Sequence, residues 1–197
     1  QYSRPRVNGI NAITIREGDQ LRDVKLTNGN SEIVIGLKSG RAIRFPEEKV
    51  RTMGRSAAGV RGVTLGGPKD EVVGMVCVDR EDEKTILVVS ENGYGKRTNL
   101  DDPETGDAVY RVTNRGGKGV KTINVTDKTG TLIAMKNVTD DDDLMIITKK
   151  GITIRMHVEQ LRVMGRATQG VKVISIRGED EITAVAKVYR EREIGRE

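Results

Sequence analysis

Hydrophobic and polar residues alternate over short stretches of the chain, and this pattern predicts strands rather than helices. After Gly170, for example, the apolar residues include Val171, Ile174 and Ile176, and the polar residue Ser175 separates the last two. In an extended segment, residues two positions apart project from the same face. We therefore expect this segment to be a strand with one buried face.

The same pattern returns along the chain, anchored each time on a glycine. The segment RATQGVKVISI at 166–176 recurs as RGGKGVKTINV at 115–125, as RSAAGVRGVTL at 55–65 and, more weakly, as PRVNGINAITI at 5–15. Such self-similarity is typical of folds built from equivalent units. The anchor glycines are Gly9, Gly59, Gly119 and Gly170. We predict equivalent strands after the last three, with buried Val60, Val120 and Val171 and, beside them, Val63, Ile123 and Ile174.

A hairpin is predicted ahead of each of the last three anchor glycines. In each, two strands flank a turn, at Ser39-Gly40, Asn92-Gly93 and Lys150-Gly151. Asn-Gly is a strong hairpin signal because both residues tolerate positive φ. Residues 158–164 have the spacing of one helical turn, but their counterpart in the first full repeat contains Pro46, so we predict loops at both places.

The spacing of the repeats predicts the architecture. The anchor glycines lie 50, 60 and 51 positions apart, and seven extra residues, 103–109, account for the long middle interval. Pro, Gly and acidic residues in this insertion predict an exposed loop. Short strands with a period of about 50 residues are typical of a radial, propeller-like array. We predict an all-β fold in one domain over residues 1–197, with approximate repeats 1–30 (partial), 31–80, 81–138 and 139–190.

Basic residues repeat in register with the apolar ones. An arginine stands four positions after each hairpin glycine, an Arg-x-x-(Gly/Asn)-Arg element follows, and a cation comes two positions after the anchor glycine. The inner residues of that element, Gly54, Asn114 and Gly165, adopt left-handed backbone readily, which predicts a sharp turn presenting both arginines. The candidate anion-binding residues are Arg44, Arg51, Arg55, Arg61, Lys96, Arg97, Arg111, Arg115, Lys118, Lys121, Arg155, Arg162, Arg166 and Lys172.

Composition favours a polyanionic partner, and duplex DNA over single-stranded nucleic acid. The net charge is +5, which favours a polyanionic partner, and evenly repeated cations match evenly spaced phosphates. Aromatic residues make up only 3% of the chain, too few for the stacking platforms of single-strand binders. The alternative is a solvated face of paired charges, because Glu48, Asp101 and Glu159 each lie four residues after the first arginine of a repeat.

Features of a catalytic or metal site are scarce. Cys77, the single cysteine, lies in an apolar run and is predicted to be a buried, inert thiol. The acidic run 140–143 lacks the spacing and glycine of a calcium loop and is predicted to be a solvated turn. His157, the single histidine, is expected at the surface, without a catalytic role. No phosphate-binding or dinucleotide-binding glycine motif is present.

Two further features concern the origin of the chain. The longest apolar run, 72–78, is too short to span a bilayer, and a cytoplasmic location is expected. The chain begins at Gln1 and has no signal-peptide pattern, so we expect it to be a piece of a longer protein.

Three segments resemble the C-terminal domain of the A protein of bacterial DNA gyrase. They are NGYGKRT at 92–98, VRTMGRSAAGVRGV at 50–63 and VMGRATQGVKVI at 163–174, and the resemblance extends over nearly the whole chain. It implies a β-pinwheel, a propeller-like disc of four-stranded blades that exchange strands. The family usually has six blades, and this chain is similar to the last three, with the closing strand of the one before.

The resemblance also implies a function. Duplex DNA would wrap around the basic rim, independently of sequence, and so support negative supercoiling by a nucleoid-associated holoenzyme of two A and two B subunits. This domain would hold no cofactor and no catalytic residue, because ATP hydrolysis, DNA cleavage and Mg²⁺ belong to other domains of that family's enzymes. No membrane is expected as a partner.

Two departures from the family pattern leave alternatives open. By the resemblance, the diagnostic basic, glycine-rich box of gyrase is expected in the first blade, upstream of this piece. NRGGKG at 114–119 resembles its second half but falls in register with the ordinary repeat, and the chain as given shows no long acidic tail. The C-terminal domain of topoisomerase IV, which shares the pinwheel, is therefore the first alternative. A propeller that scaffolds other proteins is the second, although it predicts more aromatic residues. An enzyme in its own right is the least expected class.

Overall fold

A computed structural model describes residues 7–79, 85–176 and 178–189, and within them almost all regular structure is β. The all-β prediction is confirmed. Two single turns of 3₁₀ helix, η1 (Glu47–Lys49) and η2 (Val158–Gln160), open the connections at Pro46 and at residues 158–164, for which only loops were predicted. The strands are β1 (Glu32–Leu37), β2 (Arg41–Pro46), β3 (Val72–Val78), β4 (Thr85–Ser90), β5 (Tyr94–Asn99), β6 (Val120–Lys121), β7 (Leu132–Val138), β8 (Asp142–Thr148), β9 (Thr153–His157), β10 (Val171–Lys172) and β11 (Ile182–Tyr189).

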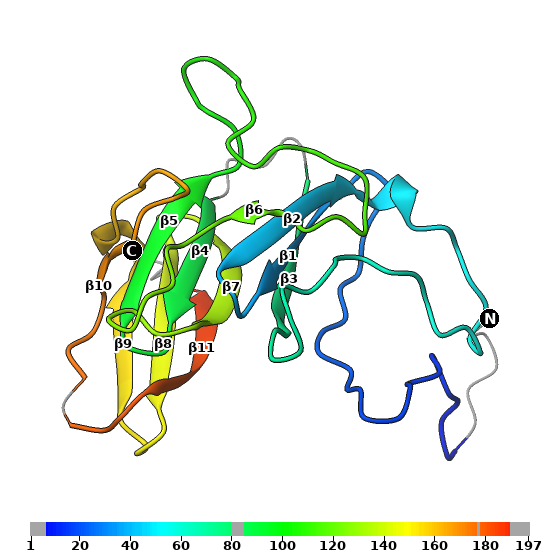
Figure 1. Ribbon diagram of the computed structural model, residues 1–197, viewed down its shortest axis with the longest axis horizontal. Coiled ribbons are helices and arrows are strands. Elements are labelled where there is room, and N and C mark those ends of the chain that lie inside the picture. Colours follow the sequence, from blue (N-terminus) through cyan, green and yellow to red (C-terminus); the bar gives the residue numbers. More distant parts are fainter. Residues whose placement is uncertain (1–6, 80–84, 177, 190–197) are drawn as a thin grey trace, which may run out of the picture.

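The strands form three antiparallel sheets that follow one another across the molecule (Figure 1). Their orders are β3-β1-β2-β6, β10-β5-β4-β7 and β11-β8-β9. In the first two, the strand after the hairpin comes from the next repeat: β6 pairs with β2, and β10 pairs with β5. Each four-stranded blade is therefore completed by its neighbour, which is the strand exchange of a pinwheel.

The third sheet has three strands, and the outer edge of β9 carries no partner strand within the described ranges. The missing strand leaves β9 more exposed than its counterparts in the other two blades. Three positions after the hairpin glycine, Ile43 is 1% exposed and Lys96 is 0% exposed, whereas Ile154 on β9 is 37% exposed. Burial of the first two positions thus depends on the following repeat, which covers the blade before it.

The strands predicted after the anchor glycines are much shorter than expected. Only two residues pair in β6 and in β10, and the segment after Gly59 forms no strand because the described residues before β1 contain no hairpin of an earlier repeat with which it could pair. Val60, Val120 and Val171 are consequently half-buried, which corrects the prediction that they are core residues. Ile123 and Ile174 are buried, as expected, while Val63 is half-buried.

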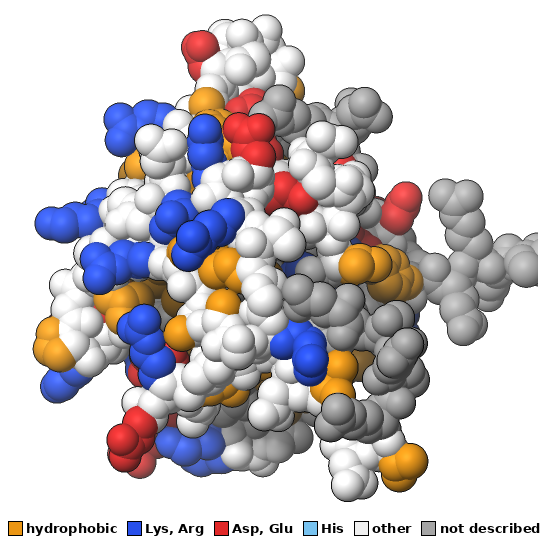
Figure 2. All heavy atoms as spheres, turned by 90° about the vertical axis from the view of Figure 1, so that its right-hand side faces the viewer, with side chains coloured by type: hydrophobic (Ala, Val, Ile, Leu, Met, Phe, Trp, Pro, Cys, Tyr) orange, Lys and Arg blue, Asp and Glu red, His pale blue; other side chains and the backbone are white. Residues whose placement is uncertain are grey.

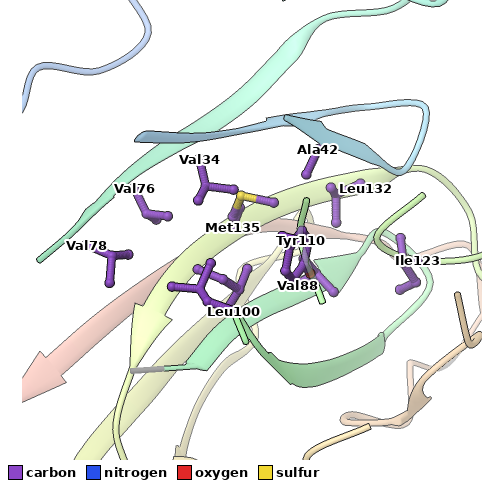
Figure 3. Packing of buried hydrophobic residues seen from close by; sticks show 11 residues of the cluster. Val34, Ala42, Val76, Val78, Val88, Leu100, Tyr110, Ile123, Leu132 and Met135 are labelled. Carbon is purple, nitrogen blue, oxygen red and sulfur yellow. The ribbon is translucent and has the colours of Figure 1, made fainter. Parts of the chain in front are cut away.

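The hydrophobic core lies between blades. One cluster joins the first two sheets, with Val34 and Val76 from the first facing Val88, Leu132 and Met135 from the second (Figure 3). A second cluster joins the second and third sheets in the same way. Because each core is shared, the apolar burial that stabilises one blade also fixes its position against the next.

The insertion at residues 103–109 is exposed at its tip, as predicted, and stands away from the body at the top of Figure 1. Asp102 caps its turn by accepting hydrogen bonds from the backbone N–H groups of Glu104 and Thr105. At its base, the N–H of Tyr110 donates to the carbonyl of Leu100 at 3.0 Å. The two ends of the insertion therefore already lie side by side.

Gly119→Ala should destabilise the fold more than Gly59→Ala. Both glycines have positive φ, at +66° and +87°, so alanine costs about 1–2 kcal/mol at either position. A Cβ at Gly119 would also lie 2.3 Å from the carbonyl oxygen of Ala42, whereas a Cβ at Gly59 would meet nothing within 4 Å. Chemical denaturation should show a further loss of roughly 1–3 kcal/mol for Gly119→Ala. Equal losses would contradict the close approach of β6 to β2.

Deletion of residues 103–109 should leave stability nearly unchanged. Joining Asp102 to Tyr110 would place Tyr110 three positions after Leu100, so their existing hydrogen bond would close an ordinary β-turn. Exposed loops tolerate such changes in length. Thermal unfolding should give a melting temperature within a few degrees of the parent. A drop of ten degrees or more would show that the insertion packs against the body.

Candidate nucleic-acid interface

Three loops of equal length precede the anchor glycines, at residues 50–58, 110–118 and 161–169, and we call them the first, second and third basic loops. The second residue of each loop is an arginine that is exposed to solvent: Arg51, Arg111 and Arg162. None of the three forms an ion pair with a described residue. Their guanidinium groups are thus available to an external anion. Figure 2 shows one face of the molecule, on which many Lys and Arg side chains stand out beside fewer Asp and Glu side chains.

The second arginine of each basic loop binds the backbone of the preceding repeat. In every case the acceptor is the carbonyl of the residue two positions after an anchor glycine. Arg55 donates to Asn11 at 3.5 Å, Arg115 donates to Arg61 at 3.0 Å, and Arg166 donates to Lys121 at 2.8 Å. These arginines therefore hold each basic loop against the preceding repeat, and none of the three is buried.

A backbone hydrogen bond accompanies each of these contacts. The N–H groups of Thr14, Thr64 and Asn124 donate to the carbonyls of Ala57, Gly117 and Thr168 at 3.2, 2.9 and 3.0 Å. Each donor lies five residues after an anchor glycine, and each acceptor lies two residues before the next one. The three basic loops are therefore mounted on successive repeats in the same way.

The turn inside the basic loops differs from the prediction. The residues Gly54, Asn114 and Gly165 do not have positive φ. Gly54 and Gly165 instead accept a hydrogen bond from the residue three positions later, as the first residue of an ordinary turn does, which needs no left-handed backbone there. In the second loop the left-handed residue is Gly116, with φ of +84°.

Arg44 is a buried structural residue, and its prediction as an anion-binding residue is wrong. It is 6% exposed, pairs with Glu32 and Asp101, and donates to the carbonyls of Leu100 and Tyr110 at 3.0 and 3.2 Å. Burial alone would lower the pKa of Arg44, but the hydrogen bonds with Asp101 and Glu32 outweigh it and raise the pKa. Arg44 therefore joins its own blade to the following one.

Arg97 repeats this arrangement in the next blade and is corrected for the same reason. It is 6% exposed, pairs with Asp140 and donates to the carbonyl of Leu161 at 2.8 Å. The third member of the series, Arg155, has a half-exposed side chain and pairs with Asp143 at 2.7 Å. Of the three arginines, only Arg155 keeps the exposed surface that an anion needs.

Lys96 is also buried, which corrects its prediction as a direct DNA contact. It is 0% exposed, and its ammonium donates to the carbonyls of Gly165 and Arg166 at 2.5 Å and to Thr168 Oγ1 at 3.1 Å. Burial, with a smaller contribution from the charge of Arg166, lowers the pKa of Lys96 to about 8. The other predicted cations lie at least partly at the surface: Arg61, Lys118, Lys121 and Lys172.

The acidic run at 140–143 is only half a solvated turn. Asp140 and Asp141 are exposed, but Asp142 and Asp143 are buried, because β8 already begins at Asp142. Asp143 lies 2.6 Å from Nδ1 of His157, whose own side chain is half-exposed. Across the described ranges, no group of three or more His, Cys, Asp and Glu residues could hold a metal ion.

Two remaining predictions concern Cys77 and the membrane. Cys77 is half-buried rather than buried, and burial raises its pKa, which lowers the reactivity expected of its thiol. No helix in the described part of the chain has the length and apolar character needed to cross a membrane.

Comparison with known proteins assigns this architecture to one family. A family model described as the DNA gyrase C-terminal domain, beta-propeller, matches residues 5–28, 38–79, 84–139 and 142–188. The DNA gyrase A protein of Staphylococcus aureus strain NCTC 8325 / PS 47 is 43% identical over 192 residues, which are 98% of this chain and 21% of the relative. For strain MRSA252 the identity is 44% over 187 residues, 95% of this chain and 20% of the relative.

Two solved structures are similar over most of the chain. The C-terminal domain of DNA gyrase A matches with a TM-score of 0.77 at 25% identity, covering 91% of this chain and 58% of that one. The C-terminal domain of DNA topoisomerase IV matches with a TM-score of 0.84 at 25% identity, covering 95% and 56%. The all-β, propeller-like architecture predicted from the repeats, and the pinwheel implied by the resemblance, are thereby confirmed.

Arg44→Met should destabilise the protein strongly, whereas the matched change Arg51→Met should not. Loss of Arg44 removes the guanidinium from buried Glu32 and from two buried carbonyls, which costs about 3–5 kcal/mol. Arg51 is exposed, so its loss should change the free energy of unfolding by less than about 0.5 kcal/mol. Urea denaturation measures both. Comparable losses for the two variants would contradict the division into buried and external arginines.

Proposed function

The chain belongs to the DNA gyrase C-terminal domain family, and from this premise we propose that it binds duplex DNA independently of sequence and bends the duplex along its basic loops. One observation carries the proposal. Three basic loops are mounted identically on successive repeats, and each presents an exposed arginine at its start. Phosphates recur evenly along a duplex, so evenly placed cations can contact successive segments of one backbone.

The proposed DNA contacts form two groups. The outer group consists of exposed residues: Arg51, Arg61, Arg111, Lys118, Lys121, Arg162 and Lys172. The inner group adds positive charge from arginines that also bind backbone carbonyls: Arg55, Arg115 and Arg166. Arg155 flanks the third loop. Side chains of this kind neutralise phosphates and set the register of the protein on the duplex without reading bases.

The mounting of the loops supports bending rather than simple attachment. Curving a site of 20–30 base pairs costs on the order of 1–6 kcal/mol, which contacts along the whole arc must offset. Loops on flexible tethers would follow a straight duplex. Here each loop is held to the preceding repeat by an arginine–carbonyl bond and a backbone hydrogen bond, so the protein sets the path and the DNA conforms to it.

The wider role of the chain is part of the same proposal. The chain spans about a fifth of the length of the curated relatives it matches. We propose that it acts within a gyrase of two A and two B subunits in the cytoplasm, on nucleoid DNA, where the bent duplex supports negative supercoiling. ATP hydrolysis, strand cleavage and Mg²⁺ would then belong to other parts of the enzyme, and this chain would bind no cofactor.

A corresponding role in topoisomerase IV is the second candidate, because the structural match to that enzyme's domain has the higher TM-score of the two. The identity of 43–44% to the gyrase A protein over nearly the whole chain favours the gyrase role. A supercoiling assay of the longer enzyme distinguishes the two roles. Introduction of negative supercoils is required for the gyrase role, whereas relaxation alone would favour topoisomerase IV.

Binding should be steep in salt and selective for duplex DNA. Neutralisation of roughly six phosphates gives a slope of log K against log salt of about −5. Replacement of Arg51, Arg111 and Arg162 by Ala should flatten the slope to roughly −2 to −3, because about 0.9 is lost for each phosphate contact. Fluorescence anisotropy with a labelled duplex, and with its single strand as the control, measures both.

Either of two results would contradict the proposed function. One is a salt dependence close to zero for the unmodified chain. The other is single-stranded DNA binding that is tighter than duplex binding at every salt concentration. An unchanged slope in the triple variant would instead move the DNA path away from the first arginines of the basic loops.

A further inference from the structure

A charged residue occupies a position in the second blade that is apolar in the other two. Lys96 stands three residues after the hairpin glycine, where the first blade has Ile43 and the third has Ile154. Ile43 and Lys96 are equally buried, at 1% and 0% exposure. Burial of an ammonium group is unfavourable unless oxygen atoms replace its water, whereas isoleucine needs no such compensation. Packing alone therefore does not explain a lysine at this position, and a role of its charged group has to be considered.

All three acceptors of the Lys96 ammonium belong to the third basic loop. They are the carbonyls of Gly165 and Arg166 and the hydroxyl of Thr168, and they satisfy the three donors of the group. Two of these oxygens flank the turn that carries Arg166. The ammonium thus holds the backbone of the loop, while the side chain of Arg166 binds the carbonyl of Lys121.

Among the described residues, no carboxylate contributes to the shift in the pKa of Lys96. Arg166 is the charged neighbour that lowers its pKa. On β5 itself, Arg97 is engaged by Asp140 and Leu161. On β10, Lys172 lies opposite Tyr94 in the register. Arg166 is thus the charged group that acts on Lys96, and a DNA phosphate at the third basic loop would favour the charged form of Lys96.

We propose that Lys96 is a positioning residue for the third basic loop: its charged form fixes the loop backbone for DNA contact, and DNA binding at this loop is coupled to a proton on Lys96. The inference rests on the proposed function, since it assumes that Arg162 and Arg166 meet the duplex. The first blade should lack this proton coupling, because Ile43 occupies the equivalent position there.

The sign of the coupling follows from the pKa of Lys96, which is lowered to about 8 from an ordinary value of 10.5. As pH rises through 8, the folded chain loses the proton and with it one donor to the loop, so DNA affinity falls. Stability changes in the opposite direction. Between pH 8 and 10.5 the unfolded chain binds more protons at this lysine, so this residue's contribution to the free energy of unfolding rises with pH.

Lys96→Ile is the test variant, because the first blade shows that isoleucine fits this position. The dissociation constant of a labelled duplex is measured for the 197-residue chain and the variant from pH 7 to 9.5 at constant ionic strength. The unmodified chain should lose affinity as pH rises, so the logarithm of its dissociation constant should rise with pH, with a slope between 0 and +1. Lys96→Ile should bind about three- to tenfold more weakly at pH 7 and lose this pH dependence.

Lys128→Ala, which removes an exposed lysine, is the matched control and should keep the pH dependence of the parent. If Lys96→Ile fails to fold, calorimetry of the unmodified chain at pH 8 in two buffers of different ionisation enthalpy still tests the coupling, through proton uptake on DNA binding. Duplex binding with the same affinity and pH profile in Lys96→Ile, or with no proton uptake, would overturn the inference and leave the proposed function standing. Absence of duplex binding by the unmodified chain would overturn the proposed function itself.

Discussion

The pairing of one repeat's edge strand with the previous repeat's hairpin is the constraint on which the structure depends. β6 pairs with β2 and β10 with β5, and at each junction an anchor glycine lies against the neighbouring backbone, where a Cβ would come within 2.3 Å of Ala42 or 2.6 Å of Gly95. No blade of this kind is complete within its own repeat. The angle between blades is consequently set by main-chain hydrogen bonds and a shared apolar core, both of which resist deformation.

Electrostatics repeat with the same period but act in two separate layers. Inside, Arg44 and Arg97 cross each junction and bind carboxylates and carbonyls of the following repeat. Outside, the arginines that open the basic loops remain available to phosphates. The inner layer fixes where the loops stand, and the outer layer supplies charge. Under the proposed function, a rigid curved array of this type would bend DNA because the protein is harder to deform than the duplex.

Local sequence patterns predicted much of the fold, whereas contacts between residues far apart in the sequence could not be predicted from them. The hairpins and the exposed insertion depend on residues a few positions apart, and they are present as expected. The strands after the anchor glycines depend on a partner hairpin from another repeat, and they are shorter than predicted. The burial of Arg44 depends on Asp101, 57 positions away, and that of Lys96 on Arg166, 70 positions away. A cation that recurs in every repeat can be either a buried structural contact or an exposed residue. Periodicity does not distinguish these cases, so both kinds of cation were predicted to contact DNA. Three of the fourteen candidates were buried for this reason.

The central claim, that a rigid series of basic loops imposes curvature on a duplex, is tested most directly by energy transfer between dyes at the two ends of a duplex of about 40 base pairs. We predict that saturating protein brings the ends closer together. Replacement of Arg162 and Arg166 by Ala should reverse most of that change while weakening affinity only modestly, because the remaining loops can hold a straighter duplex. Saturated binding with no change in end-to-end distance would contradict the account.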